Sequence, residues 1–278
     1  MKPRTPSHWI QWLLIAIGLA LLTLVVLLPV ITVFVEAFAA GLAAYWGSIS
    51  DPDALHALRL TLLITAIAVP LNTVFGLLVS WLLARRSFRG QALLLALLDL
   101  PLSISPIVVG FMMILVFSPE MGLFADAIQR SGLRVVFATP GLAITLLFVT
   151  VPFVAREVYP ALQQVPREEE EAARCLGASG WRTFWSVTLP HIRPALIYGV
   201  MLCTARALGE FGAISVVSGK IIGSTNTLTL HVERTYLEYD ATAAFACASL
   251  LGSVALLSLA VQTLVRRNPG SESATARS

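Results

Sequence analysis

The chain has 278 residues, of which 57% are hydrophobic and only 13% are charged, against roughly 25% charged residues in ordinary soluble domains. A chain with so little charge could not cover a water-facing surface, which excludes a soluble globular enzyme. The formal net charge of +3 comes from scattered basic residues, so it does not indicate a nucleic-acid-binding protein, which would gather them on one face.

Six apolar stretches are long enough to form transmembrane helices, which need roughly 20 mostly apolar residues each. In chain order they cover about 12–35, 59–83, 92–117, 135–155, 195–218 and 241–265. The first is longer than the apolar region of a signal peptide, roughly 7–15 residues. The sequence therefore predicts an all-α, polytopic membrane bundle over 12–265, with a short cytoplasmic N-terminus at 1–11 and a disordered cytoplasmic tail at 266–278.

The basic residues also predict the orientation of this bundle, because Lys and Arg are enriched in cytoplasmic connections. With the N-terminus placed inside, 13 of the 19 basic residues fall on the inner side and five on the outer side, while Arg206 lies within a span. Both termini are therefore expected in the cytoplasm.

Two of the predicted spans contain residues that interrupt a helix. The third has Asp99, Pro101, Ser103, Ser105 and Pro106. The second has Pro70 and Asn72 near its middle. Proline removes a helix hydrogen bond, and in lipid the freed carbonyl must be satisfied by a neighbouring helix, a hydroxyl group or water in a cavity. Each kink is therefore either a feature of helix packing or one that lines or gates a transport pathway.

The longest polar stretch, at about 156–194, is predicted to be a cytoplasmic loop with two short helices. Pro166 suits a first helical position, and the glutamates at 168–171 complement the positive end of the helix dipole. Gly177 is placed to close this helix in the left-handed conformation, and Ser179 can cap the next one.

The second helix of the loop carries an aromatic stripe. Trp181, Phe184, Trp185 and Thr188 lie at i, i+3, i+4 and i+7, a spacing suited to the membrane face. We expect Leu189-Pro190 to end this helix before the fifth span begins.

Several residues of the loop resemble the EAA loop of ATP-binding-cassette importer permeases at every fixed position. They are Glu171, Ala172, Ala173, Gly177, Val187, Leu189 and Pro190. The resemblance implies that the loop docks in a groove on a separate ATPase subunit. Glu171 would supply charge, Ala172 and Ala173 would allow close approach, and Gly177 would set the turn. The alternative is a solvated acidic loop without a partner.

A second resemblance concerns the stretch 205–233, which includes the run Arg206-Ala207-Leu208-Gly209-Glu210-Phe211-Gly212. It is similar to sulfate/thiosulfate importer permeases, and most like their W-type subunit. Molybdate permeases share the EAA loop and this Arg-x-x-Gly-Glu-Phe-Gly stretch, so a molybdate or tungstate permease stays an alternative. The family implies a multi-pass protein of the bacterial inner membrane. Its partners would be an ATPase subunit, a T-type permease in a heterodimer, a periplasmic sulfate/thiosulfate-binding protein and membrane lipid.

Arg206 and Glu210 share one face of the fifth predicted helix, and Arg206 lies near the bilayer midplane. A charge there costs about 2.5–3.5 kcal/mol, so Arg206 is expected to face the bundle interior with a partner. Two readings stay open. Arg206 pairs with Glu210 or Asp99 to fix helix packing, or it is a positive point on the path of a divalent oxyanion.

Catalytic motifs are missing from the sequence. Gly219-Lys220 is followed by Ile221, which is not a phosphate-binding loop, and no G-x-S-x-G or H-E-x-x-H occurs. The three cysteines have spacings that match no metal site. We therefore predict a transport subunit that is not an enzyme, with no catalytic residue, metal site or cofactor of its own, and with ATP and Mg²⁺ bound by the partner ATPase. An ion-coupled secondary transporter is the alternative of a different class, and Asp99 and Glu210 are its candidate ion-binding acids.

The connection between the fifth and sixth spans is polar and predicted to lie outside, where it could receive a periplasmic binding protein. Its polar residues are Lys220, Ser224, Asn226, Thr227, His231 and Arg234. We expect His231 to be a surface residue rather than a metal ligand.

Overall fold

A computed structural model describes residues 8–120 and 122–266, and these residues contain helices and no strand. The predicted tail 266–278 and the first seven residues of the predicted segment 1–11 lie outside the described residues, apart from Arg266. The all-α prediction is confirmed for the part that the structure describes.

The first half of the fold begins with a long N-terminal helix and includes a pair of helices separated by a sharp bend. Its elements are α1 (His8–Leu22), the π-helical η1 (Thr23–Leu27), α2 (Leu28–Ala39), α3 (Leu42–Ser50), α4 (Pro52–Arg85), α5 (Gln91–Ser103), α6 (Pro106–Phe117) and α7 (Ala125–Ser131). The second half comprises α8 (Thr139–Gln164), α9 (Arg167–Cys175), α10 (Gly180–Thr183), the π-helical η2 (Phe184–Thr188), α11 (Leu189–Leu208), α12 (Gly212–Val217), α13 (Leu228–Leu237) and α14 (Ala241–Arg266).

Helix α8 is the centre of the bundle and packs against α4, α5 and α11. A methyl group added at Gly76 of α4 would lie 2.9 Å from Cβ of Val154, and one added at Gly199 of α11 would lie 3.1 Å from its Cα. The two glycines therefore let α4 and α11 approach α8 closely, as small residues do between membrane helices. Ile64, Leu142, Leu146 and Ile192 are among the side chains buried in this core.

Within the described residues, three continuous helices are long and apolar enough to cross a membrane. They are Gln11–Ala39, Pro52–Arg85 and Thr139–Gln164. The pair α5 and α6 makes a fourth candidate if the two helices are counted as one span. The chain is thus a multi-pass membrane protein in which α11 and α14 are further long helices.

The third predicted span is not one straight helix. Helices α5 and α6 meet at an angle of 109°, because Ile104 and Ser105 have extended backbone with ψ of 138° and 134°. Pro106 forces this conformation on Ser105, since a residue before proline avoids the helical region. Pro101, by contrast, lies inside α5 without ending it.

The fifth predicted span, 195–218, is also interrupted, and there the expectation of a single helix is wrong. Helix α11 ends at Leu208, and α12 begins at Gly212. A methyl group at Gly212 would lie 2.9 Å from Cβ of Pro106, and α12 packs along α6. The two helix breaks therefore lie next to each other.

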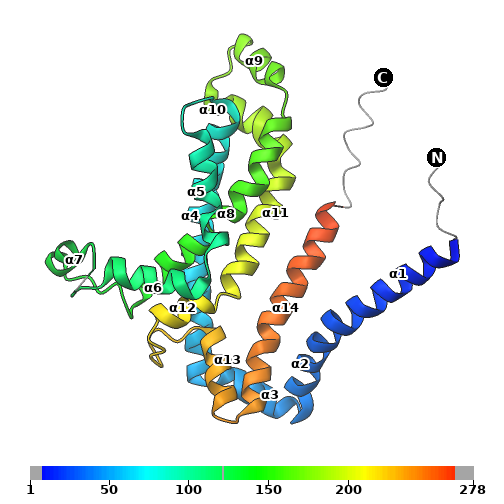
Figure 1. Ribbon diagram of the computed structural model, residues 1–278, viewed down its shortest axis with the longest axis vertical. Helices are drawn as coiled ribbons and strands as arrows, with labels where there is room; N and C mark the ends of the chain where they lie inside the picture. Colours follow the sequence, from blue (N-terminus) through cyan, green and yellow to red (C-terminus); the bar gives the residue numbers. More distant parts are fainter. Residues whose placement is uncertain (1–7, 121, 267–278) are drawn as a thin grey trace.

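Figure 1 shows the polar connections at opposite ends of the bundle. Helices α9 and α10 lie at the upper end, while α3 and α13 lie at the lower end. Helices α4, α5, α8 and α11 run between them, and α6 and α7 project to one side. Helix α14 packs against α2, α3, α11 and α13.

The connection around α13 is more buried than the sequence predicts. His231 is buried, so the expectation of a surface residue is wrong, and Asn226 and Thr227 are buried as well. The reason is that α13 folds back against α4 and α14. Burial lowers the pKa of His231, and the charge of Arg234 adds to this effect. Lys220 stays exposed and pairs with Glu233 at 2.6 Å.

The contact between α6 and α12 predicts the effect of one small substitution. In Gly110→Ala the new methyl group would lie 2.7 Å from Cβ of Val216 and 2.8 Å from the backbone oxygen of Ala213. Overpacking of this kind costs roughly 1–3 kcal/mol. We expect a lower thermal unfolding midpoint for the purified protein in detergent.

Gly18→Ala is the matched control, because nothing lies within 4 Å of its added methyl group. Alanine is also the better helix former, so this variant should unfold at the wild-type temperature or above. A Gly110→Ala midpoint equal to that of Gly18→Ala would contradict the described packing of α6 on α12.

Candidate functional site

The polar loop begins with α9, and Gly177 closes this helix as predicted. Gly177 has φ of +88°, a conformation that favours glycine. Its N–H donates to the carbonyl of Arg174 at 2.9 Å, and the N–H of Ala178 donates to the carbonyl of Ala173 at 3.0 Å. These two bonds form a Schellman motif. Pro166 occupies the N-cap position, one residue before the first helical position predicted for it, and its side chain makes no capping hydrogen bond.

The next helix begins where the sequence predicts but does not end there. The hydroxyl of Ser179 accepts from the N–H of Arg182 and so caps α10. The helix then continues through η2 into α11, so the expectation that Leu189-Pro190 ends it is wrong. Proline lacks an N–H and clashes with the carbonyl four residues earlier in an α-helix. Here the helix contains a π-helical turn, in which the N–H of Leu189 donates to the carbonyl of Phe184. This turn is wider than an α-helical one and so accommodates the proline.

The two tryptophans of the aromatic stripe are exposed, whereas Phe184 is half-buried. Trp181 and Trp185 are exposed, and their rings contact each other and Phe184. Thr188 is buried, so its predicted place on the membrane face is wrong. It points toward α9 because its hydroxyl donates to Oε1 of Glu170 at 2.8 Å.

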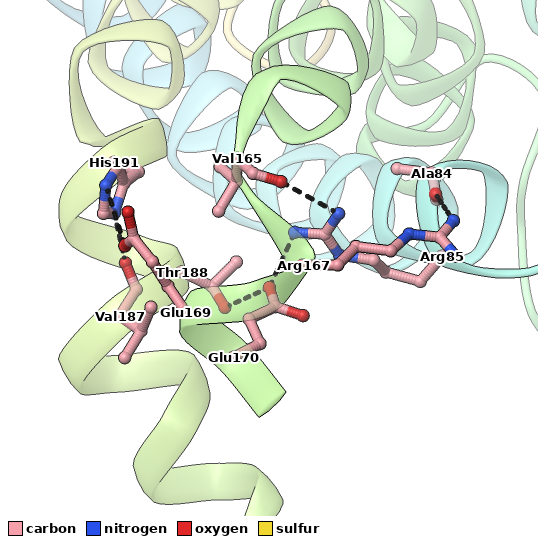
Figure 2. A network of polar contacts seen from close by, with 9 residues as sticks. All are labelled: Ala84, Arg85, Val165, Arg167, Glu169, Glu170, Val187, Thr188 and His191. Carbon is pink, nitrogen blue, oxygen red and sulfur yellow. Dashed lines mark hydrogen bonds and ion pairs between the residues drawn. The ribbon is translucent and has the colours of Figure 1, made fainter. Parts of the chain in front are cut away.

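Glu170 is the one buried glutamate of the four in α9. Its Oε1 also accepts from Nη2 of Arg85 at 2.7 Å, and the two side chains are 8% and 9% exposed. Nη1 of Arg85 donates to the carbonyl of Val165 at 3.4 Å. Figure 2 shows Arg85 and Thr188 converging on this carboxylate from opposite sides. Removing one member of a buried ion pair costs about 3–5 kcal/mol, so the pair holds α9 against the bundle.

Two weaker contacts flank this pair and are more exposed (Figure 2). Nη2 of Arg167 donates to the carbonyl of Ala84 at 3.3 Å. Nε2 of His191 lies 3.3 Å from Oε2 of Glu169. The first is an exposed hydrogen bond to a backbone carbonyl, and the second is an exposed pair of a type that contributes about 0–1 kcal/mol, so both orient α9 less firmly than Glu170 does.

The opposite face of α9 is open to solvent. Glu171 and Ala172 are exposed, and Leu176 is 89% exposed at the turn. A cleft of about 330 Å³ beside the turn is lined by Ala173, Leu176, Gly177, Ala178, Arg182, Thr183 and Ser186. An apolar tip beside small residues is a surface that another protein can approach closely.

The candidate residues in the membrane lie on both sides of the two helix breaks. Nη1 of Arg206 pairs with Oε2 of Glu210 at 2.5 Å, and Oε1 of Glu210 accepts from the N–H of Ala213 and so caps α12. Glu210 is fully buried, whereas Arg206 is 33% exposed.

Asp99 does not pair with Arg206. It lies 3.5 Å from Arg156 of α8, because α5 packs on α8. Both candidate ion-binding acids, Asp99 and Glu210, thus already have a basic partner. The hydroxyl of Ser103 donates to the carbonyl of Asp99, and Ser105 precedes α6 without a side-chain cap.

Sequence reasoning singled out Glu171 and missed Glu170, Arg85 and Thr188. The available signal was the pair Arg85-Arg86 at the end of the second predicted span, close to the membrane edge. In the parts of the chain that the structure describes, no group of three or more His, Cys, Asp or Glu residues is placed to hold a metal ion.

Comparison with known proteins identifies the family. Residues 72–269 match the family model described as binding-protein-dependent transport system inner membrane component. Sulfate permease 2, chloroplastic, of Chlamydomonas reinhardtii is 50% identical over 96% of this chain and 72% of its own length. The sulfate transport system permease protein CysW of Synechocystis is 48% identical over 94% of both chains. CysT of Escherichia coli is 37% identical over 91% of this chain and 92% of its own.

Solved structures agree on the fold. A chain of a bacterial ABC transporter that imports the acidic polysaccharide alginate has a TM-score of 0.76 at 15% identity, over 94% of this chain and 96% of that one. The same type of transporter in complex with an alginate-bound periplasmic protein gives 0.74 at 16% identity, over 92% of both chains. The chain therefore belongs to the family of binding-protein-dependent transport system inner membrane components, and the CysW permeases are among its relatives.

Proposed function

We propose that this chain is the permease subunit of an ATP-driven importer of sulfate and thiosulfate in the bacterial inner membrane. The observation that carries the proposal is the similarity to sulfate permeases along nearly the whole chain, together with a loop built for docking at one end of the bundle. The chain is a transport component rather than an enzyme, as its family is.

The proposed topology has six spans with both termini in the cytoplasm. Under this topology the broken pair α5–α6 counts as one span, and α11 and α14 complete the set. The placement of α9 and α13 at opposite ends of the bundle supports it (Figure 1), because one connection would be cytoplasmic and the other periplasmic. The excess of basic residues on the α9 side supports the same orientation.

The proposed coupling site is the outward face of α9 with its turn. Glu171 would contact a basic group of the ATPase, and the small Ala172 and Ala173 would let α9 sit deep in a groove. Gly177 keeps the turn tight, and Leu189 and Pro190 mark the point where the loop passes into α11. Closure of the ATPase subunits on ATP would then move α9 and switch the access of the pathway. ATP and Mg²⁺ would bind to those subunits and not to this chain.

The proposed assembly contains a second permease and a periplasmic binding protein. Relatives of two types, CysW and CysT, both align with this chain over more than nine-tenths of its length, which supports a heterodimer with a T-type permease. The alginate transporter was solved with its periplasmic protein bound. The connection with exposed Lys220 and Ser224, on the side opposite α9, is the proposed contact for such a protein.

The proposed pathway passes the two adjacent helix breaks. Irregular backbone within a membrane is tolerated where it is buried in protein or lines a water-filled cavity. The partly exposed guanidinium of Arg206 would attract a divalent oxyanion there, and Glu210 would hold the Arg206 side chain in position. Ser103 and Ser105 would offer hydroxyl groups at the other break, and Asp99 lies one turn before Ser103.

Uptake of labelled anions by cells with and without this chain tests the substrate. We expect the deletion to abolish uptake of sulfate and thiosulfate, and the cloned chain to restore it. Molybdate uptake should be unchanged. Loss of molybdate uptake with normal sulfate uptake would contradict the proposal and favour a molybdate or tungstate permease.

Gly177→Asp tests the coupling site. Nothing lies within 4 Å of an added Cβ, so the substitution strains only the left-handed backbone, by roughly 1–2 kcal/mol, and places a new charge at the contact. We expect the ATPase subunit to co-purify with the wild-type chain but much less with this variant.

Gly180→Asp, which also meets nothing within 4 Å but lacks a positive φ, serves as the control and should retain more ATPase. Equal recovery of ATPase with Gly177→Asp and with the wild type would place the contact elsewhere.

Substitutions of Arg206 test the pathway, with assembly of the complex checked separately. We expect Arg206→Ala to lower sulfate uptake strongly, because the positive charge is lost, and Arg206→Lys to retain part of it, because the charge stays without the planar guanidinium. Unchanged uptake by an assembled Arg206→Ala complex would remove Arg206 from the pathway.

A further inference from the structure

We propose that Glu170 is the positioning residue that transmits movement of α9 to the membrane helices. The inference rests on the proposed coupling role of the loop and adds a mechanical route to it. Its basis is the single carboxylate oxygen that accepts from both Arg85, at 2.7 Å, and Thr188, at 2.8 Å.

The partners of this carboxylate lie at the ends of the helices that form the core. Arg85 is the last residue of α4, and its second amino group donates to Val165, which directly follows α8. Thr188 directly precedes α11 in the continuous helix from α10. One side chain of α9 thus connects to the ends of α4, α8 and α11, which pack against one another in the membrane.

Burial makes this connection stiffer than the other contacts of α9. A hydrogen bond between charged groups is shorter and stronger than one between neutral groups, and salt screens a buried pair much less than an exposed one. The contacts of Arg167 and Glu169 are exposed. When α9 is displaced, the carboxylate of Glu170 must therefore either carry the three helix ends with it or lose both of its bonds.

The four glutamates of α9 differ in their surroundings because they lie on different faces of the helix. Successive helical residues are rotated by about 100°, so when Glu170 points at the bundle its neighbours Glu169 and Glu171 point away from it, and Glu168, two residues away, lies on the opposite side. Glu170 is buried, and Glu168, Glu169 and Glu171 are exposed. Of the three exposed side chains, Glu171 is the proposed contact with an ATPase and Glu169 lies beside His191, while the buried Glu170 faces the permease core.

Glu170→Gln in the complete transporter tests the inference, reconstituted in vesicles with its ATPase and binding protein. The amide keeps an acceptor for Thr188 but removes the charge that pairs with Arg85. We expect the complex to assemble and to hydrolyse ATP, while sulfate imported per ATP falls roughly fivefold or more, the lower bound of usual coupling energies between sites. Glu168→Gln, the same change on the exposed face, should import sulfate at the wild-type ratio.

Thr188→Val is the second variant and removes the hydroxyl that links Glu170 to α11. This variant should also lower the amount of sulfate imported per ATP. If Glu170→Gln reduces the yield of assembled complex, the ratio measured with Thr188→Val is the test of the inference. Wild-type ratios in assembled Glu170→Gln, or in Thr188→Val where the former does not assemble, would overturn the inference. A wild-type complex without ATPase or without sulfate import would instead contradict the proposed function.

Discussion

The ion pair between Arg85 and Glu170 fixes the position of the polar loop relative to the helices of the bundle. Both side chains are buried, and a buried charge without a partner is costly, so α9 cannot leave the end of α4 without a large loss of stability. The same carboxylate binds Thr188, which joins the second helix of the loop to the first. The loop is therefore a firmly held structure with one open face, as a docking element for another protein requires.

The membrane helices, in contrast to this firmly held loop, are interrupted at two places. The breaks between α5 and α6 and between α11 and α12 lie together because Gly212 allows close contact with Pro106. Glu210 satisfies an N–H group at the start of α12 and neutralises Arg206. A firmly connected loop at one end and two adjacent helix breaks further along the helices are the features that the proposed transport pathway would use. Movement at the first could then alter access at the second.

Local sequence rules predicted the local features well. The apolar stretches marked the long helices, and Gly177 and Ser179 have the backbone roles that their residue types favour. The predictions that failed concern residues whose burial depends on contacts with residues far away in the sequence. Glu170 is selected over Glu171 by an arginine 85 positions away, and His231 is buried by the return of α13 against α4 and α14. Pro190 did not end its helix because a π-helical turn accommodated it. Such accommodation depends on the packing around the helix and not on the residue alone.

The most direct measurement uses a natural cysteine of the chain. Cys175 is exposed near the end of α9, whereas Cys203 and Cys247 are buried, so a membrane-impermeant maleimide should react at α9 without any mutation. If the loop is the cytoplasmic contact for an ATPase, Cys175 is labelled in inside-out vesicles stripped of that subunit and protected after it is added back. Labelling of Cys175 in intact cells from the outside, or equal labelling with and without the ATPase, would contradict the central claim that an ATPase subunit binds this loop on the cytoplasmic side.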